Sequence, residues 1–257
     1  MRELQALIFD VDGTLADTER DGHRVAFNQA FAAAGLSWEW DDDLYGELLG
    51  VTGGKERIRH YLDTYLPDFK RPQAYDAFVA GLHQAKNRVY AELLATGGIP
   101  LRPGVRRLLE EARAAGLRLA IATTTSPENV SALLTHALAA DGAAWFEVIA
   151  AGDIVPAKKP APDIYTWALQ QMKLKPEQAL AFEDSENGVR SSLGAGLKTI
   201  VTTNEYTRTH NFSGAALVVD QLGAPDAPFK IIQGPVLRAT HVDVALLHKI
   251  HADGVPG

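Results

Sequence analysis

The chain has 257 residues, a net charge of −7 and no cysteine, which excludes disulfides, thiolate zinc sites and cysteine nucleophiles. Its hydrophobic content of 46% is ordinary for a globular protein, and no apolar run approaches the ~20 residues that span a bilayer. The negative charge argues against nucleic-acid binding, which relies on neutralising many phosphates. The length suits one large domain, or a core with a smaller inserted domain, and we expect a soluble protein without a membrane partner.

The first predicted strand is ALIFD, and it leads into two aspartates. It begins within a few residues of Met1, which leaves no room for a secretion signal, so we expect a cytoplasmic location. Asp10 and Asp12 lie at its end, and Gly13 follows them. Because glycine lets the backbone turn tightly, the pattern predicts two carboxylates on a sharp turn after a buried strand.

The segment after this strand shows helical periodicity and little strand pattern. Apolar residues at helical spacing are Phe27, Ala30, Phe31 and Ala34, then Ile58, Tyr61, Leu62 and Tyr65. The glycines and prolines of TGGIPLRPG (96–104) interrupt the helical pattern. We therefore predict an all-helical cap domain over residues 19–95, inserted into a core domain formed by residues 1–18 and 96–257.

From about residue 100, short apolar runs alternate with amphipathic segments, as strands and helices do in a parallel sheet. With the first strand, the runs at 117–123, 146–151, 178–184 and 198–203 make five predicted strands. The fold class is therefore α/β, with a Rossmann-like parallel sheet as the core.

The helices between these strands show their own start and stop signals. The segment VRRLLEEARAAG predicts a helix that begins at Val105, with Gly116 as its left-handed cap. Ser126 and Pro127 predict the start of the next one. The tail from Gly223 is rich in proline and glycine, and ends in one helix-like segment, HVDVALLHKIH.

Polar residues follow four of the predicted strands, and in an open α/β sheet the reactive groups collect at the carboxyl ends of the strands. They are Asp10 and Asp12, Thr123 to Ser126, the segment KKPAPD, and Glu183 with Asp184. Clustered carboxylates suit Mg²⁺, which binds one or two of them together with water and phosphate oxygens. We therefore expect a Mg²⁺ site at this edge of the sheet.

The motifs DVDGT, TTTS, KPAPD and EDSxNG occur in an order that resembles the haloacid dehalogenase superfamily, in the β-phosphoglucomutase-like subgroup with a helical cap. More narrowly, TGGKERI and IATTTSPENV resemble the CbbY-type sugar-bisphosphate phosphatases. The resemblance covers nearly the whole chain. It implies a Mg²⁺-dependent phosphatase that acts, as a monomer, on a small phosphorylated sugar through an aspartyl phosphate, with xylulose 1,5-bisphosphate as the favoured substrate.

The resemblance also implies roles for residues at the strand ends. Asp10 would accept the phosphoryl group, Thr123 would donate its hydroxyl to a phosphoryl oxygen, and Lys159, as the buried lysine of its pair, would offset negative charge. Asp184 would bind the metal together with Asp10 and the backbone carbonyl of Asp12. A carboxylate that attacks a phosphate dianion faces repulsion, so positive charge is needed there.

Two further carboxylates have less direct roles. Asp12 would protonate the leaving oxygen and later activate water, and we expect neighbouring carboxylates to bring its pKa nearer to neutrality by repulsion. For Glu183 three roles stay open: direct metal binding, metal binding through water, or capping of the next helix.

Cap residues are expected to contact the substrate. Glu19 and His23 begin the cap on the side that faces the aspartates, although His23 is as well explained by packing or solvation. The loop with Gly54 and Lys55 either contacts a polar substrate as the cap closes, or is a glycine-rich helix start that leaves Lys55 and Arg57 exposed. In the core, the expected substrate contacts are Thr124, Thr125 and Ser126.

Other functions use the same fold. A phosphomutase of this superfamily is one alternative. A phosphonate hydrolase would need a cap lysine, for which Lys55 is available, but the presence of Asp12 argues against it. A dehalogenase has no use for the second aspartate or the metal. A regulator that binds sugar phosphates without turnover would not need every catalytic position to be intact.

Overall fold

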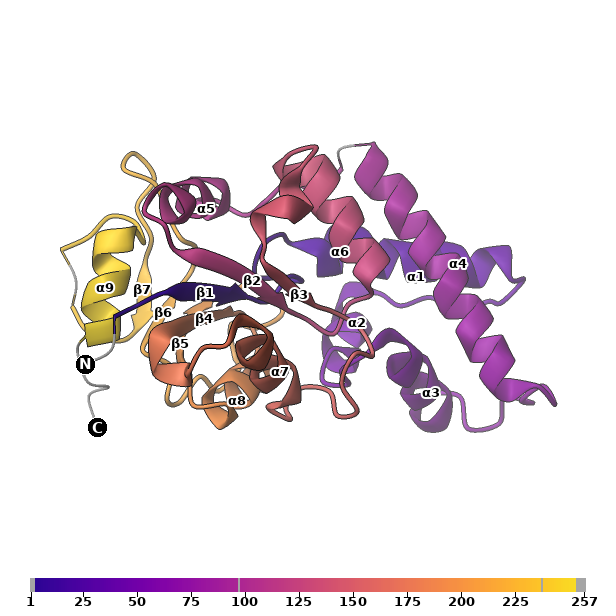
Figure 1. Cartoon of the computed structure of the whole chain (residues 1–257). Coiled ribbons are helices and arrows are strands. Elements are labelled where there is room, and N and C mark those ends of the chain that lie inside the picture. The colour runs from indigo at the N-terminus through magenta and orange to yellow at the C-terminus, as the bar shows by residue number, and fades with distance from the viewer. Residues whose placement is uncertain (1–2, 97, 237, 253–257) are drawn as a thin grey trace.

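The computed structural model describes residues 3–96, 98–236 and 238–252. Within these residues a seven-stranded sheet has the order β3-β2-β1-β4-β5-β6-β7 (Figure 1). Strands β1 to β6 are parallel, and β7 is antiparallel to β6. The strands are β1 (Ala6–Phe9), β2 (Arg118–Ala122), β3 (Val148–Ala150), β4 (Ala179–Glu183), β5 (Lys198–Thr202), β6 (Leu217–Val219) and β7 (Ile231–Gln233).

The helices form two groups along the chain. Between β1 and β2 lie η1 (Glu19–Arg24), α1 (Val25–Ala33), α2 (Asp42–Leu48), α3 (Gly54–Thr64), α4 (Tyr75–Ala95) and α5 (Val105–Ala114). After β2 come α6 (Pro127–Leu133), η2 (Leu134–Leu138), η3 (Gly142–Trp145), α7 (Asp163–Met172), η4 (Pro176–Gln178), α8 (Glu186–Gly194) and α9 (Val244–Ala252). Helices α1 to α4 gather at one end of the molecule, while α5 and α7 lie on opposite sides of the sheet (Figure 1).

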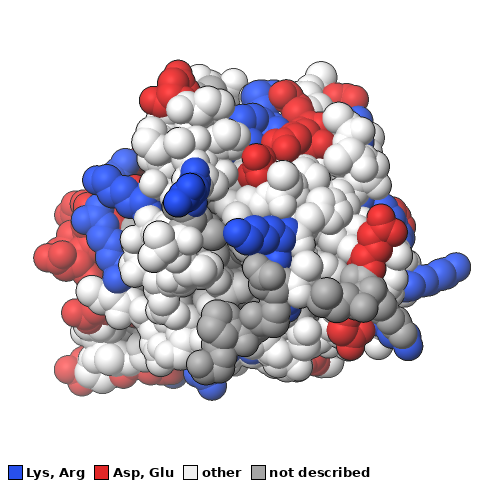
Figure 2. All heavy atoms as spheres, turned by 90° about the vertical axis from the view of Figure 1, so that its left-hand side faces the viewer, with Lys and Arg blue, Asp and Glu red and all other residues white. Residues whose placement is uncertain are grey.

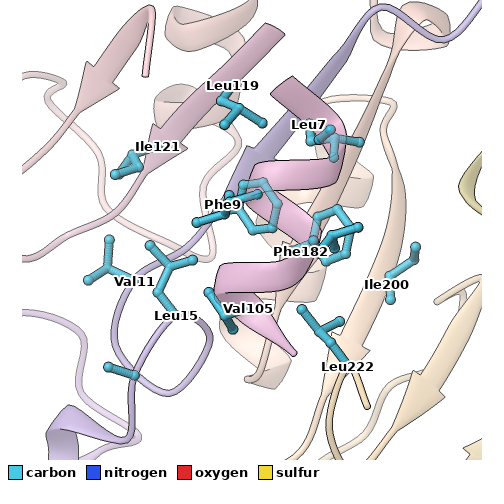
Figure 3. Packing of buried hydrophobic residues seen from close by; sticks show 14 of the residues in the cluster. Leu7, Phe9, Val11, Leu15, Val105, Leu119, Ile121, Phe182, Ile200 and Leu222 are labelled. Carbon is cyan, nitrogen blue, oxygen red and sulfur yellow. The ribbon is translucent and has the colours of Figure 1, made fainter. Parts of the chain in front are cut away.

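Alternate residues of β1 are buried on opposite faces of the sheet, as the two-residue period of a strand requires. Leu7 and Phe9 pack in the cluster that includes α5, whereas Ala6 and Ile8 pack in the cluster that includes α7. Figure 3 shows Phe9 beside Phe182 of β4, and their ring centroids lie 4.4 Å apart. Each large side chain buried in this way contributes roughly 1.5–3 kcal/mol of hydrophobic free energy, so the strand that carries Asp10 is firmly held.

Helices α1 to α4 have a core of their own, apart from that of α5 and the sheet. Its buried members are mostly aromatic: Phe27, Phe31, Trp38, Trp40, Tyr45, Leu48, Ile58, Tyr61, Leu62, Val79 and Leu82. Tyr90 and Leu94, in the last turns of α4, pack instead with the residues around α5. The α/β class, with a Rossmann-like sheet and a helical cap, is confirmed, and the domain limits at residues 18/19 and 95/96 stay a prediction.

The five predicted strands and the last helix are confirmed, but two further strands were missed. β6 and β7 have three residues each. β7 is exposed, whereas β6 is buried and lies in the apolar run AALVV (215–219), a signal that was overlooked. β7 lies within the proline- and glycine-rich tail and makes the sheet mixed rather than wholly parallel. Ala34 and Tyr65 are exposed rather than buried, because each is the residue just after its helix ends.

Two observations concern the surface. Among the described residues, no helix combines the length and the apolar character that crossing a membrane requires. On the face in Figure 2, which is the side of Figure 1 that carries α9 and β7, charged residues of both signs are scattered among uncharged ones.

Candidate active site

The site lies where β1, β2 and β4 end side by side. The strand registers pair Phe9 with Ile121 on one side and with Phe182 on the other. The backbone N–H of Asp10 extends this pairing, since it donates to the carbonyl of Phe182 over 3.0 Å. Residues that follow the three strands therefore lie at the same edge of the sheet, as the sequence predicted for Asp10, Thr123 and Glu183.

Lys159 connects two of the carboxylates at this edge. Its Nζ donates to Oδ1 of Asp10 over 2.7 Å and to Oε1 of Glu183 over 2.6 Å. The Tyr165 hydroxyl donates to the same Glu183 oxygen over 2.5 Å. Burial disfavours the charge of Lys159, but the negative charges of Asp10 and Glu183 raise its pKa above the usual range. Lys159 is buried and Lys158 only partly so, as predicted.

Three buried carboxylates here can hold a divalent cation. Asp10, Glu183 and Asp184 each offer an oxygen within 4.8 Å of the others. Burial, and then the neighbouring charges, raise the pKa of Asp184 well above its usual range, while burial raises that of Asp10 to about 7. Oε2 of Glu183 is buried and has no hydrogen-bond partner among the described residues. These three carboxylates offer hard oxygen ligands, and a bound Mg²⁺ would offset the repulsion between their charges.

Asp12 is not part of this cluster, and its side chain contacts Thr18 and His23, the latter from the cap. Its Oδ1 accepts from the Thr18 hydroxyl over 2.5 Å and lies 2.9 Å from Nε2 of His23. Burial acts to raise the pKa of Asp12, but the charge and hydrogen bond of His23, with Thr18, hold it below the usual range. The predicted shift toward neutrality is wrong, because a cap histidine outweighs the repulsion expected from other carboxylates.

A buried lysine that the sequence analysis missed lies behind His23. Nζ of Lys86 is 2.7 Å from Nδ1 of His23 and stands over the rings of Phe27 and Tyr90. Burial lowers the pKa of Lys86 to about 8. A signal was available, since Lys86 continues the apolar stripe of Val79, Leu82 and Tyr90 along α4.

Arg57 is a second missed cation. Its Nη1 donates to the Tyr45 hydroxyl over 2.9 Å, and this hydroxyl donates to Oε2 of Glu19 over 2.5 Å. Nε of Arg57 donates to the carbonyl of Leu48 over 3.2 Å. The alternative in which Arg57 is exposed is wrong, because only 7% of it is exposed. The Tyr45 hydroxyl thus connects Glu19 with Arg57 within the predicted cap.

A cavity of about 380 Å³ separates the cap from the core. The predicted substrate-binding residues that line it are Glu19, His23, Gly54, Lys55, Thr124, Thr125 and Ser126. It is also lined by four cationic side chains, those of Lys55, Arg57, Lys86 and Lys158. A neighbouring cavity of about 90 Å³ is lined by Asp10, Asp12, Thr123, Lys159 and Asp184, among others.

Two of these lining residues also have local structural roles. Ser126 accepts a hydrogen bond from the backbone N–H of Asn129 and caps α6, and Pro127 is the first residue of that helix, as predicted. Gly54 begins α3, and a Cβ there would lie 2.6 Å from the His83 ring. The glycine is therefore needed for close packing beside the cavity.

Comparison with known proteins places this site in a class. The family model of haloacid dehalogenase-like hydrolases matches residues 4–196. The chain therefore belongs to the haloacid dehalogenase-like hydrolases, and its site is that of a phosphoric monoester hydrolase.

Within this family, the chain is similar to several proteins called CbbY. Protein CbbY of Rhodobacter capsulatus is 50% identical over 222 residues, which are 86% of this chain and 95% of that protein. The plasmid-encoded protein CbbY of Cupriavidus necator is 48% identical over 225 residues, 88% of each chain. A crystal structure of an aspartate-to-asparagine variant of CbbY from Rhodobacter sphaeroides, in complex with xylulose-(1,5)bisphosphate, is 48% identical with a TM-score of 0.77; the match covers 85% of this chain and 94% of that one.

Proposed function

We propose that this phosphatase hydrolyses a small sugar bisphosphate, with xylulose 1,5-bisphosphate as the favoured substrate, in a Mg²⁺-dependent reaction through an aspartyl phosphate. The observation that carries the proposal is the contact between Asp10 and Lys159 beside a cavity lined by four cationic side chains. The complex of a 48% identical relative with this sugar supports the choice of substrate.

In the proposed reaction, Asp10 attacks the phosphorus atom and the phosphoryl group passes to its carboxylate. Lys159 compensates negative charge on Asp10 and on the transferring group, and the Thr123 hydroxyl donates to a phosphoryl oxygen. Asp10, Asp184 and the carbonyl of Asp12 would hold Mg²⁺, with Glu183 nearby, and the ion would neutralise phosphate charge at this point.

Asp12 is the general acid and base in this scheme. Its ionised form accepts hydrogen bonds from Thr18 and His23, which suits the step in which a base takes a proton from the water that cleaves the aspartyl phosphate. To protonate the sugar oxygen first, Asp12 must itself carry a proton, so it must first leave the contacts with Thr18 and His23 that keep it ionised. Because His23 belongs to the cap, the position of the cap and the proton transfer are coupled.

Asp184→Asn is expected to weaken the dependence on Mg²⁺. The change removes a charged ligand and keeps the size of the side chain, so a higher Mg²⁺ concentration is needed for half-maximal activity. A Mg²⁺ titration of phosphate release measures this. A titration curve identical to that of the wild type would mean that the metal site is misplaced.

Lys55→Ala is expected to lower kcat/KM for xylulose 1,5-bisphosphate roughly ten- to a hundredfold, since a charge-assisted contact to the remote phosphate contributes about 1.5–3 kcal/mol. Para-nitrophenyl phosphate has no second phosphate, so its hydrolysis should be unaffected. Binding energy from the remote phosphate also helps the cap to close over the substrate. We therefore expect kcat to fall and KM to rise. Equal losses on both substrates would place Lys55 in the shared chemistry, and no loss on either would leave it a solvated residue.

Phosphate release from a panel of sugar phosphates, with and without Mg²⁺, tests the proposed function. We expect release from xylulose 1,5-bisphosphate to depend on Mg²⁺ and to exceed that from sugar monophosphates. Formation of an isomeric sugar phosphate without release would favour a phosphomutase. Binding without any turnover would favour a regulator.

A further inference from the structure

A group of four alternating charges joins the cap to the core at the rim of the larger cavity. Nζ of Lys55, in the first turn of α3, donates to Oδ2 of Asp153 over 2.9 Å. Nζ of Lys158 lies 3.1 Å from Oδ1 of the same Asp153 and donates to Oε2 of Glu56 over 3.1 Å. Lys55 and Glu56 come from the cap, whereas Asp153 and Lys158 follow β3 in the core.

The Asp153 carboxylate lies between two cations that line the substrate cavity. Each of its oxygens is paired with one lysine, so the carboxylate occupies the position that an anionic ligand of this rim would take. Its side chain is 61% exposed, against 33% for Lys55 and 20% for Lys158, which leaves it free to swing into solvent. Hydrogen bonds from Lys55 and then Lys158 lower its pKa to about 2, so it is charged at neutral pH.

We propose that Asp153 is a specificity-determining residue whose carboxylate gives up its place between Lys55 and Lys158 to the remote phosphate of a bisphosphate substrate. The inference rests on the proposed function and deepens it. A phosphate dianion brings more negative charge and more acceptor oxygens than one carboxylate. A small monoester, whose only phosphate lies at Asp10, leaves the Asp153 contacts in place. The exchange therefore favours substrates that carry a second anionic group.

The test replaces Asp153 with asparagine and measures how strongly xylulose 1,5-bisphosphate inhibits hydrolysis of para-nitrophenyl phosphate. The inhibition constant does not require turnover of the sugar. Removal of the competing charge should lower this constant about three- to fivefold, the scale of a partly exposed ion pair. The kcat/KM of the artificial ester should not change.

Glu205→Gln is the matched control. Glu205 pairs with Arg20 of the cap over 2.9 Å and does not line the larger cavity. The substitution therefore removes an ion pair between cap and core without affecting Lys55 or Lys158. We expect it to leave both measurements unchanged.

An unchanged or raised inhibition constant in Asp153→Asn would overturn the inference. Weaker inhibition by the sugar together with a lower kcat/KM for the artificial ester would also overturn the inference. This result would assign Asp153 to cap closure in general. If the sugar inhibits and the constant falls as expected, but no phosphate is released from it, the proposed hydrolysis fails while the role of Asp153 in binding stands. A sugar that does not inhibit the wild type would overturn both.

Discussion

Asp10→Asn is expected to lower kcat at least about a thousandfold on every phosphate ester, because loss of a nucleophile removes the covalent route entirely. The amide matches the carboxylate in size, and Lys159 keeps its second contact to Glu183 over 2.6 Å. Burial already disfavours the charge at this position. The thermal midpoint should therefore stay near that of the wild type, which separates a chemical loss from unfolding.

The kcat of Asp10→Asn is measured by steady-state assays on para-nitrophenyl phosphate and a sugar bisphosphate. Its thermal midpoint is measured by thermal melts. Asp226→Asn is the control, because Asp226 is an exposed aspartate in the C-terminal tail and should behave as wild type. Near-normal activity of Asp10→Asn would remove Asp10 from the role of nucleophile.

Asp12→Asn is expected to lower kcat/KM for a sugar phosphate about 10²- to 10⁴-fold, the usual contribution of a general acid. Formation of the aspartyl phosphate from para-nitrophenyl phosphate should suffer far less, since nitrophenolate leaves without a proton. The comparison uses kcat/KM, which reports the steps up to transfer of the phosphoryl group to Asp10. A loss of equal size on both esters would show that Asp12 does not act on the leaving oxygen.

The carboxyl edge of the sheet could be predicted from the sequence because each strand there is a local apolar run with a polar residue directly after it. Asp10, Thr123 and Glu183 lie where those runs end, whereas Lys159 lies further along the loop between β3 and α7. β6 carries the same signal, because the apolar run AALVV (215–219) ends at Asp220, and it was overlooked, whereas the exposed strand β7 carries none. The formation of β7 depends on antiparallel pairing with β6, which is a tertiary effect.

The surroundings of Asp12 show what the sequence could not reveal. The prediction considered only charges near it along the strand ends, whereas its closest partners are Thr18 and a histidine eleven residues away, itself contacted by Lys86 from α4. Arg57 was considered as an exposed residue, because charged residues are seldom fully buried. Only the packed cap shows that the Tyr45 hydroxyl and a backbone carbonyl satisfy it.

Chemical trapping of the aspartyl phosphate tests the central claim most directly. Borohydride reduces an acyl phosphate to an alcohol, so the phosphorylated aspartate becomes homoserine, which mass spectrometry locates in a peptide digest. After incubation with Mg²⁺ and xylulose 1,5-bisphosphate and a rapid quench, we predict homoserine at position 10, and none in Asp10→Asn or without substrate. Substrate-dependent homoserine at Asp12 or Asp184, or turnover without any modified carboxylate, would contradict the account.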